Sequence, residues 1–139
     1  MGFARYHYAA ALCLCIGVTL GSSGAGAVDA ALTGAWVQSG TECEEVFART
    51  GKGATFKKPV SAFAPAFIIS GNRIRTPMAS CQIKGAKPSG DRRILRLACA
   101  TTVSVDDITA IFGRSGDGSL QRYLNGQDET GTSYRRCTF

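Results

Sequence analysis

The sequence predicts a mostly β protein: a single small antiparallel meander or barrel of seven to eight strands, with one short helix and two disulfides. Three observations lead to this prediction. Short apolar segments of strand length alternate with clusters of Gly, Asn, Asp, Ser and Pro, which is typical of strands joined by tight turns. Residues 28–139 have the length of one domain and contain four widely spaced cysteines. No internal repeat or heptad pattern indicates another architecture.

Residues 1–27 have the features of a signal peptide. Arg5 supplies a positive charge, Ala9–Leu20 is an unbroken apolar run, and Ala25-Gly26-Ala27 matches the A-x-A pattern of a cleavage site. A run of 12 residues is short for a membrane span, which needs roughly 20. We expect cleavage after Ala27, with Ala25 or Ala30 as alternatives, and a periplasmic or extracellular mature domain over residues 28–139.

The cysteine count supports this location. Cys13 and Cys15 lie in the predicted signal peptide, which leaves an even number in the mature chain. An even number in an oxidising compartment indicates disulfides, whereas a zinc site usually brings its ligands in close C-x-x-C pairs. Three pairings of the four cysteines are possible. We favour Cys81–Cys99 with Cys43–Cys137.

The elements before residue 66 are expected to be a strand, a helix and a second short strand. Leu32–Val37 is predicted to be the entry strand. Thr41 and Glu44 have the spacing of a capping box, which predicts a short helix over about 42–48, ended by the glycines at 51 and 53. A strand over Ala54–Lys58 and a loop over Pro59–Pro65 follow.

Hairpins dominate the rest of the chain. Gly71-Asn72 can supply the positive φ of a tight turn, and it separates the apolar segments 67–70 and 73–75. Lys87–Asp91 is a turn cluster between segments 81–84 and 94–99. The remaining predicted strands are 108–114, 120–124 and 133–139.

The second of these hairpins is the reason for the favoured pairing. Side chains alternate with period two along a strand, so Cys81 shares a face with Ile83, and Cys99 shares one with Leu97. Both cysteines are therefore expected to point inward at the open ends of paired strands. A disulfide closing this loop of roughly 19 residues would stabilise the fold by about 3 kcal/mol. Cys43 and Cys137 are paired by elimination.

Catalysis is not expected. The only histidine, His7, lies in the predicted signal peptide, so the mature chain lacks the base of Ser-His or Cys-His catalysis and any histidine metal ligand. Oxidised cysteines cannot act as nucleophiles. The carboxylate groups at 42–45, 106–107 and 128–129 fit a helix start and turns better than the paired acids of a glycosidase. We expect no enzyme activity, no cofactor and no metal.

Two kinds of binding function remain. Ala62–Pro65 and Pro77-Met78-Ala79 are apolar loops that could anchor a protein partner, although they could equally cover the barrel ends. Arg73, Arg75 and Lys84 are expected on the outward face, where they could bind an acidic polysaccharide or lipopolysaccharide, or simply be solvated. Sparse aromatic residues on that face argue against nucleic acid. The mature charge of +5, with 15 Lys and Arg against 10 Asp and Glu, fits both.

Leu32-x-Gly34-x-Trp36 resembles the opening G-x-W of lipocalin-type barrels and the start of the periplasmic inhibitors of serralysin-type metalloproteases. Together with the cysteine pattern and the ending Tyr134-Arg135-Arg136-Cys137, the chain also resembles small uncharacterised exported proteins of Gram-negative bacteria. This resemblance implies a β-barrel. From the small scaffold and its loops we expect a non-enzymatic binding or inhibitory module, a monomer acting on a protein or anionic glycan of the cell envelope. Trp36 is expected to be a core aromatic that closes one barrel end.

Overall fold

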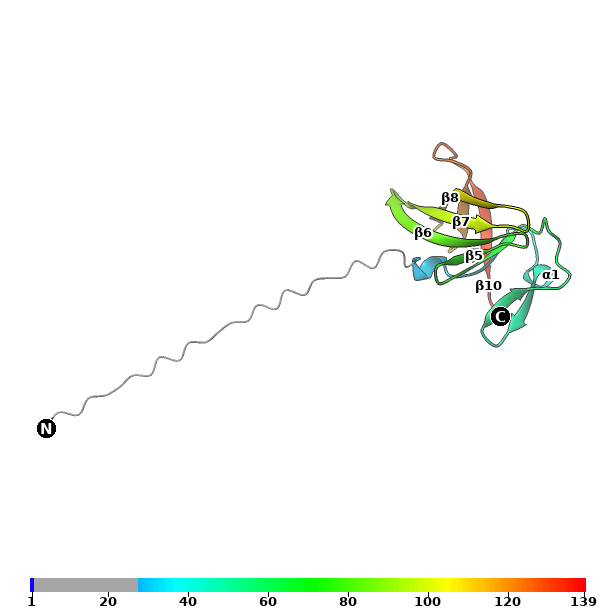
Figure 1. The fold of residues 1–139 in the computed structure, drawn as a ribbon, viewed down its shortest axis with the longest axis horizontal. Coiled ribbons are helices and arrows are strands. Elements are labelled where there is room, and N and C mark those ends of the chain that lie inside the picture. The colour runs from blue at the N-terminus through cyan, green and yellow to red at the C-terminus, as the bar shows by residue number, and fades with distance from the viewer. Residues whose placement is uncertain (2–27) are drawn as a thin grey trace.

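The computed structural model describes Met1 and residues 28–139 (Figure 1). Apart from Met1, the predicted signal peptide of residues 1–27 lies outside the described residues. None of the helices in the described part of the chain reaches the length and hydrophobicity of a membrane-spanning helix.

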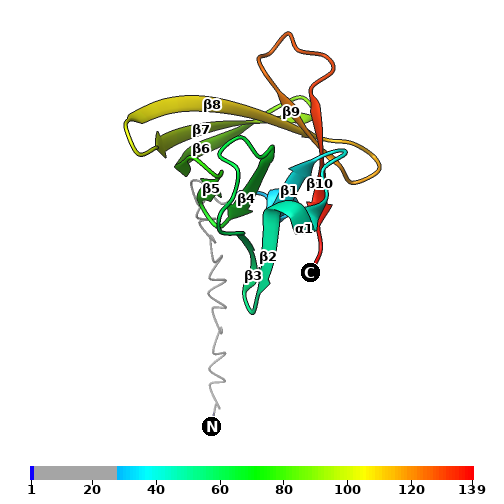
Figure 2. The same ribbon diagram turned by 90° about the vertical axis from the view of Figure 1, so that its right-hand side faces the viewer.

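Eight antiparallel strands form a closed barrel (Figures 1 and 2). Around the barrel they follow the order β1-β10-β9-β8-β7-β6-β5-β4, and β1 closes the ring by pairing with both β10 and β4. The predicted fold class is therefore confirmed, and the meander closes, which leaves the barrel sheet without an exposed edge. The barrel strands are β1 (Gly34–Gln38), β4 (Ala66–Ser70), β5 (Arg73–Arg75), β6 (Ser80–Ser89), β7 (Arg92–Ala100), β8 (Val105–Arg114), β9 (Leu120–Tyr123) and β10 (Thr132–Cys137).

The predicted hairpins form at their predicted places. Gly71 turns the chain between β4 and β5 with φ 56°, and Gly90 turns it between β6 and β7 with φ 61°. The turn between β6 and β7 is shorter than the predicted Lys87–Asp91, because residues 87–89 continue β6 and pair with β7. A glycine in the left-handed region suffices to reverse the chain, so the strands extend up to it.

The barrel is closed at the end where the chain enters. A 3₁₀ turn, η1 (Ala30–Leu32), brings Leu32 into the interior beside Trp36, which is 0% exposed. The indole N–H of Trp36 donates to the Leu32 carbonyl at 2.9 Å. Arg136 stacks its guanidinium 4.7 Å from the centre of the Trp36 ring and donates to the Ala31 carbonyl at 2.6 Å. The expectation that Trp36 is a core aromatic is confirmed.

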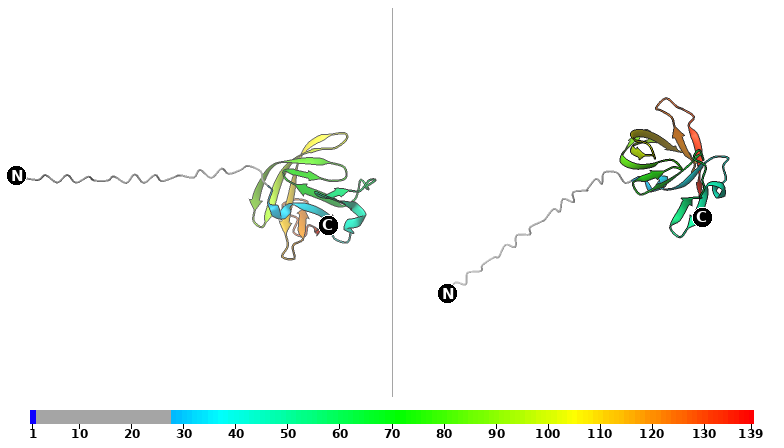
Figure 3. Two further views of the ribbon diagram at one scale, coloured as in Figure 1. Left: turned by 90° about the horizontal axis from the view of Figure 1, so that it is seen from below. Right: turned by 45° about the vertical axis from the view of Figure 1, so that its right-hand side comes forward.

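A second apolar cluster lies outside the barrel wall. Helix α1 (Cys43–Val46) and the two-stranded sheet of β2 (Phe47–Thr50) and β3 (Gly53–Phe56) lie to one side of the barrel (Figure 3). Val46 and Phe47 pack there against the outward side chains of β1 and β4, such as Val37 and Ile68. The strands β1 and β4 are thus buried on both faces, which explains their continuous apolar sequences.

The predicted helix over residues 42–48 is wrong in length and in its cap. Only Cys43–Val46 is helical. The N-cap residue is Glu42 and not Thr41, and no side-chain hydrogen bond caps the helix. The chain becomes extended at Phe47, which pairs with Phe56 across the β2–β3 ladder and is almost fully buried. Burial of this ring and the ladder hydrogen bonds outweigh the weak helical preference of so short a segment.

Both predicted disulfides are confirmed. Cys81 and Cys99 face each other directly across β6 and β7, with a Cα–Cα distance of 3.9 Å, and both belong to the interior core. Cys43 is joined to Cys137 with a Cα–Cα distance of 5.8 Å, within the outer cluster. Next to this bond, Arg135 donates to the Thr41 carbonyl at 2.8 Å and forms a 2.9 Å ion pair with Glu42.

Candidate functional site: the open mouth of the barrel

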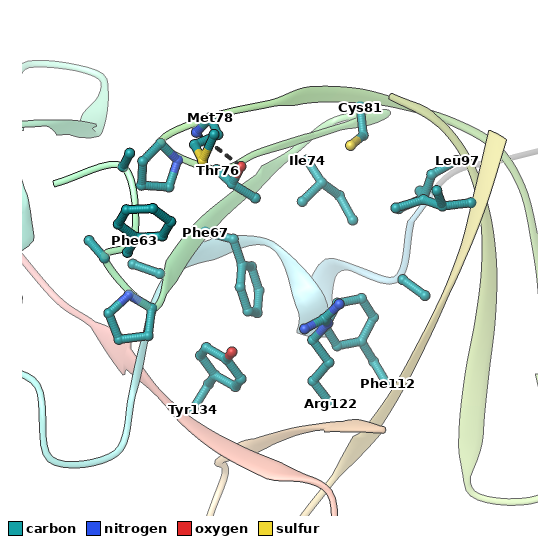
Figure 4. Close-up of a pocket in the computed structure, with 17 residues that line it drawn as sticks. Phe63, Phe67, Ile74, Thr76, Met78, Cys81, Leu97, Phe112, Arg122 and Tyr134 are labelled. Atoms are coloured by element: carbon teal, nitrogen blue, oxygen red, sulfur yellow. Dashed lines mark hydrogen bonds between the residues drawn. The ribbon is translucent and has the colours of Figure 1, made fainter. Parts of the chain in front are cut away.

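The end of the barrel opposite η1 is open and leads into a pocket of about 310 Å³ (Figure 4). This volume lies at the lower end of the range for small-molecule sites. The pocket walls are mostly side chains that the strands β4 to β8 and β10 turn inward. They include Phe67, Ile74, Cys81, Leu97, Ala110, Phe112 and Tyr134.

Two loops form the rim of this mouth. They are the loops that the sequence singled out, Ala62–Pro65 and Pro77–Ala79, and both contribute lining residues to the pocket. Phe63 is 87% exposed and Met78 is 55% exposed, although both are large apolar side chains. Exposed apolar side chains at the entrance of an apolar pocket are typical of a surface that becomes covered on binding.

Hydrogen bonds hold both rim loops in place. In the first loop, the Ala64 N–H donates to the Ser61 carbonyl at 3.0 Å, and the Gln38 N–H donates to the Pro65 carbonyl at 2.8 Å. In the second, the Thr76 hydroxyl oxygen accepts from the N–H groups of Met78 at 3.3 Å and Ala79 at 3.0 Å. The rim is therefore organised without a ligand, and binding there costs less ordering entropy.

Arg122 and Tyr134 bring polar groups into the apolar pocket. Arg122 is two residues from the buried Leu120 along β9, and alternation therefore turns both side chains inward. Tyr134 lies opposite Leu120 on the neighbouring β10. In Figure 4 the Arg122 guanidinium and the Tyr134 hydroxyl both point into the pocket. Arg122 is the only charged side chain among the described residues that line it.

The residues that the sequence predicted for anion binding lie elsewhere, on the outer face of the barrel. Arg73 and Arg75 flank the inward Ile74 on β5, and Lys84 is exposed at a register shift of β6. Arg73 donates to the Ser80 hydroxyl at 2.9 Å, and Lys84 donates to Gln82 at 2.7 Å. Lys84 also borders a hollow of about 320 Å³ with Arg96, Asp107 and Thr109.

The carboxylates are spread over the surface. Glu44 and Glu45 lie in the first turn of α1, and Asp106 accepts from the Ser104 hydroxyl at 2.7 Å. Asp128 organises the loop between β9 and β10 by accepting from the N–H groups of Leu124 and Gly131, both at 2.9 Å. These hydrogen bonds, that from Leu124 foremost, lower the pKa of Asp128. Within the described residues, no group of three or more Cys, Asp or Glu could hold a metal ion.

The fold and the site together define a closed eight-stranded barrel with an apolar pocket at its open end. No family model, no curated protein and no solved structure matches this chain.

The two rim loops of the pocket could be located from the sequence, whereas Arg122 and Tyr134 were not predicted. Their inward direction could have been predicted from the alternation of side chains along β9 and β10. The apolar Leu120 marks the inner face of β9, and Arg122 is two residues from it. What was not available is which end of the barrel stays open. That depends on η1, which places Leu32 in the other end of the barrel. Leu32 belongs there to one core cluster with residues far away in the sequence.

Proposed function

We propose that this protein is a non-enzymatic binding module whose site is the pocket at the barrel mouth, and that it takes up a small molecule with an apolar body. The observation that carries the proposal is the combination of an apolar pocket of about 310 Å³ with Phe63 and Met78 exposed at its entrance. Concave, mostly apolar pockets with a few polar groups are the usual form of small-molecule sites.

The same rim was predicted from the sequence to bind a protein partner. A pocket that extends from the rim into the barrel interior favours the small molecule, because loops that anchor a protein present side chains to its surface and need no interior space. We further propose that binding takes place in the periplasm or outside the cell. The two disulfides support an oxidising compartment, and the signal-peptide pattern of residues 1–27 supports export.

The neutral dye N-phenyl-1-naphthylamine is expected to bind the pocket with a rise in its fluorescence. Phe63→Ser should weaken this binding about fivefold, because serine cannot make the apolar contact that the Phe63 ring would make with the bound dye. Ala110→Phe, which fills the pocket from β8, should weaken it more than about tenfold. Fluorescence titration measures both.

Leu124→Ser is the matched control for Phe63→Ser. Leu124 is 83% exposed in the loop after β9 and does not line the pocket. Its substitution should change the dye affinity by no more than about twofold, since a residue without contact to the pocket has little effect on binding there. Circular dichroism shows whether Ala110→Phe folds. If it does not, Phe63→Ser still tests the proposal, because Phe63 is largely exposed and its substitution leaves the core intact. Equal losses for Phe63→Ser and Leu124→Ser, or no dye binding at all, would contradict the proposal.

Binding of an anionic polymer at the outer face is a second candidate function. The observation that favours it is a charge asymmetry: residues 66–100, from the start of β4 to the end of β7, contain seven basic residues and one acid, Asp91. Six of them are Arg73, Arg75, Lys84, Lys87, Arg92 and Arg96, and the seventh, Arg93, shares the inner face with Leu95. An excess of positive charge attracts an acidic polysaccharide or lipopolysaccharide, although Asp107 on the neighbouring β8 lies beside Lys84 and Arg96.

Replacing Arg73 and Arg75 together with Glu is expected to lower the salt concentration at which the protein leaves a heparin column. Reversal of two charges turns local attraction into repulsion, and both effects are screened by salt. The control is Arg49→Glu with Lys52→Glu, in the β2–β3 hairpin, which changes the net charge equally. The same elution shift for both double variants would show that net charge alone governs retention and would exclude a specific outer face.

A further inference from the structure

We infer that the ligand of the mouth pocket is an amphipathic organic anion, and that Arg122 and Tyr134 hold its charged head group while the apolar walls hold its tail. This inference rests on the proposed function and names the ligand class of the same site. Among the described residues that line this apolar pocket, one side chain is charged, that of Arg122.

Arg122 carries a guanidinium into a pocket that provides it with no partner. Across the described residues it makes no hydrogen bond and no ion pair, and the pocket lining contains no Asp or Glu. Its cross-strand neighbours are Phe112 on β8 and Thr132 on β10, which offer no negative charge. The Arg122 side chain is exposed to solvent at the mouth, so an incoming anion can reach it and accept charge-assisted hydrogen bonds from its guanidinium.

Tyr134 provides a second polar group on the same side of the pocket. Thr132 is the residue opposite Arg122, so Tyr134 is the diagonal neighbour of Arg122 on the inner face. Diagonal neighbours are within reach of each other for aromatic and long side chains. No protein partner of the Tyr134 hydroxyl is present in residues 28–139, and Figure 4 shows this group and the Arg122 guanidinium pointing into the same space. One hydroxyl and one guanidinium suit the oxygens of a single head group.

The remaining lining determines what is attached to that head group. Phe67, Ile74 and Phe112 line the interior, and Phe63 and Met78 border the mouth. These surfaces contact an alkyl or aromatic tail and offer little to a second charged or polar group. An inorganic anion would leave them uncovered, and a neutral apolar molecule would leave Arg122 without a partner. Only a molecule with an anionic head group and an apolar tail contacts both Arg122 and the apolar walls.

Decanoate and decan-1-ol test this inference, because they share a tail and differ in head-group charge. Both should displace N-phenyl-1-naphthylamine from the pocket, and decanoate should bind about tenfold more tightly, since a charge-assisted hydrogen bond is stronger than a neutral one. Arg122→Gln should remove this preference by weakening decanoate alone about tenfold. Tyr134→Phe should weaken decanoate by a smaller factor.

Two controls separate a local contact from general charge. Arg49→Gln removes the same charge on β2, outside the barrel, and should leave the ratio of the two affinities unchanged. Arg122→Lys keeps the charge and should retain part of the preference. Equal affinities of decanoate and decan-1-ol in the unaltered protein, or a preference that survives Arg122→Gln, would overturn the inference while the apolar pocket stands. If neither compound displaces the dye, or the dye does not bind, the proposed function itself fails.

Discussion

Replacing Cys43 and Cys137 together with alanine is expected to destabilise the protein by about 4 to 5 kcal/mol. The disulfide joins residues 94 positions apart, so its loss frees nearly the whole domain in the unfolded state. It also fastens α1 and the β2–β3 sheet to β10, and both cysteines belong to the outer apolar cluster. An effect of this size is a large share of the stability of a small domain. Urea unfolding followed by circular dichroism measures it.

The matched comparison is the double alanine variant of Cys81 and Cys99. These residues are 18 positions apart, and loss of this shorter loop is expected to cost about 3 kcal/mol. The pocket-lining Cys81 would also change the dye site slightly, whereas Cys43 and Cys137 do not line it. If the variant without the long-range bond were as stable as the one without the local bond, loop length would not explain the stabilisation.

Trp36→Ala is expected to have the second largest effect, about 3 to 5 kcal/mol. The ring is fully buried at the closed end of the barrel, and its removal opens a cavity that the rigid wall cannot fill. It also removes the donor to the Leu32 carbonyl and the surface on which Arg136 stacks. The loss of free energy of unfolding is measured by urea titration.

Trp36→Phe serves as the control for this prediction. Phenylalanine keeps most of the apolar volume but cannot donate to Leu32, so its cost should be well below that of alanine, about 1 to 2 kcal/mol. A cost below about 1 kcal/mol for Trp36→Ala would mean that η1 and Leu32 close this end of the barrel without the indole.

The hairpins could be predicted from the sequence because each depends on neighbouring residues. Gly71 and Gly90 mark their turns, and the alternation around Cys81 and Cys99 is sufficient to orient both thiols. The helix near residue 43 could not be predicted correctly. Its end at Phe47 is imposed by the barrel wall, against which this residue packs from outside. Local capping signals contain no information about such a contact.

The candidate site was predictable only in part for a similar reason. The loops around Phe63 and Met78 were recognisable as apolar turns, whereas their meeting at one mouth follows from closure of the sheet between β1 and β4. The outward direction of Arg73, Arg75 and Lys84 followed from alternation along single strands. Alternation from Leu120 places Arg122 on the inner face, unlike these surface residues. That Arg122 borders the open mouth depends on the position of β9 between β8 and β10 in the closed barrel.

The pairing of β1 with β10 has a consequence for the order of folding. These are the first and last strands of the barrel, so the ring can close only once the end of the chain is available. Cys43 waits equally long for Cys137, and meanwhile it meets only Cys81 and Cys99 among the cysteines after residue 27. Those two lie opposite each other in a local hairpin and can oxidise early. An early bond between them would remove both from pairing with Cys43 and leave Cys137 as its one remaining partner among the cysteines after residue 27.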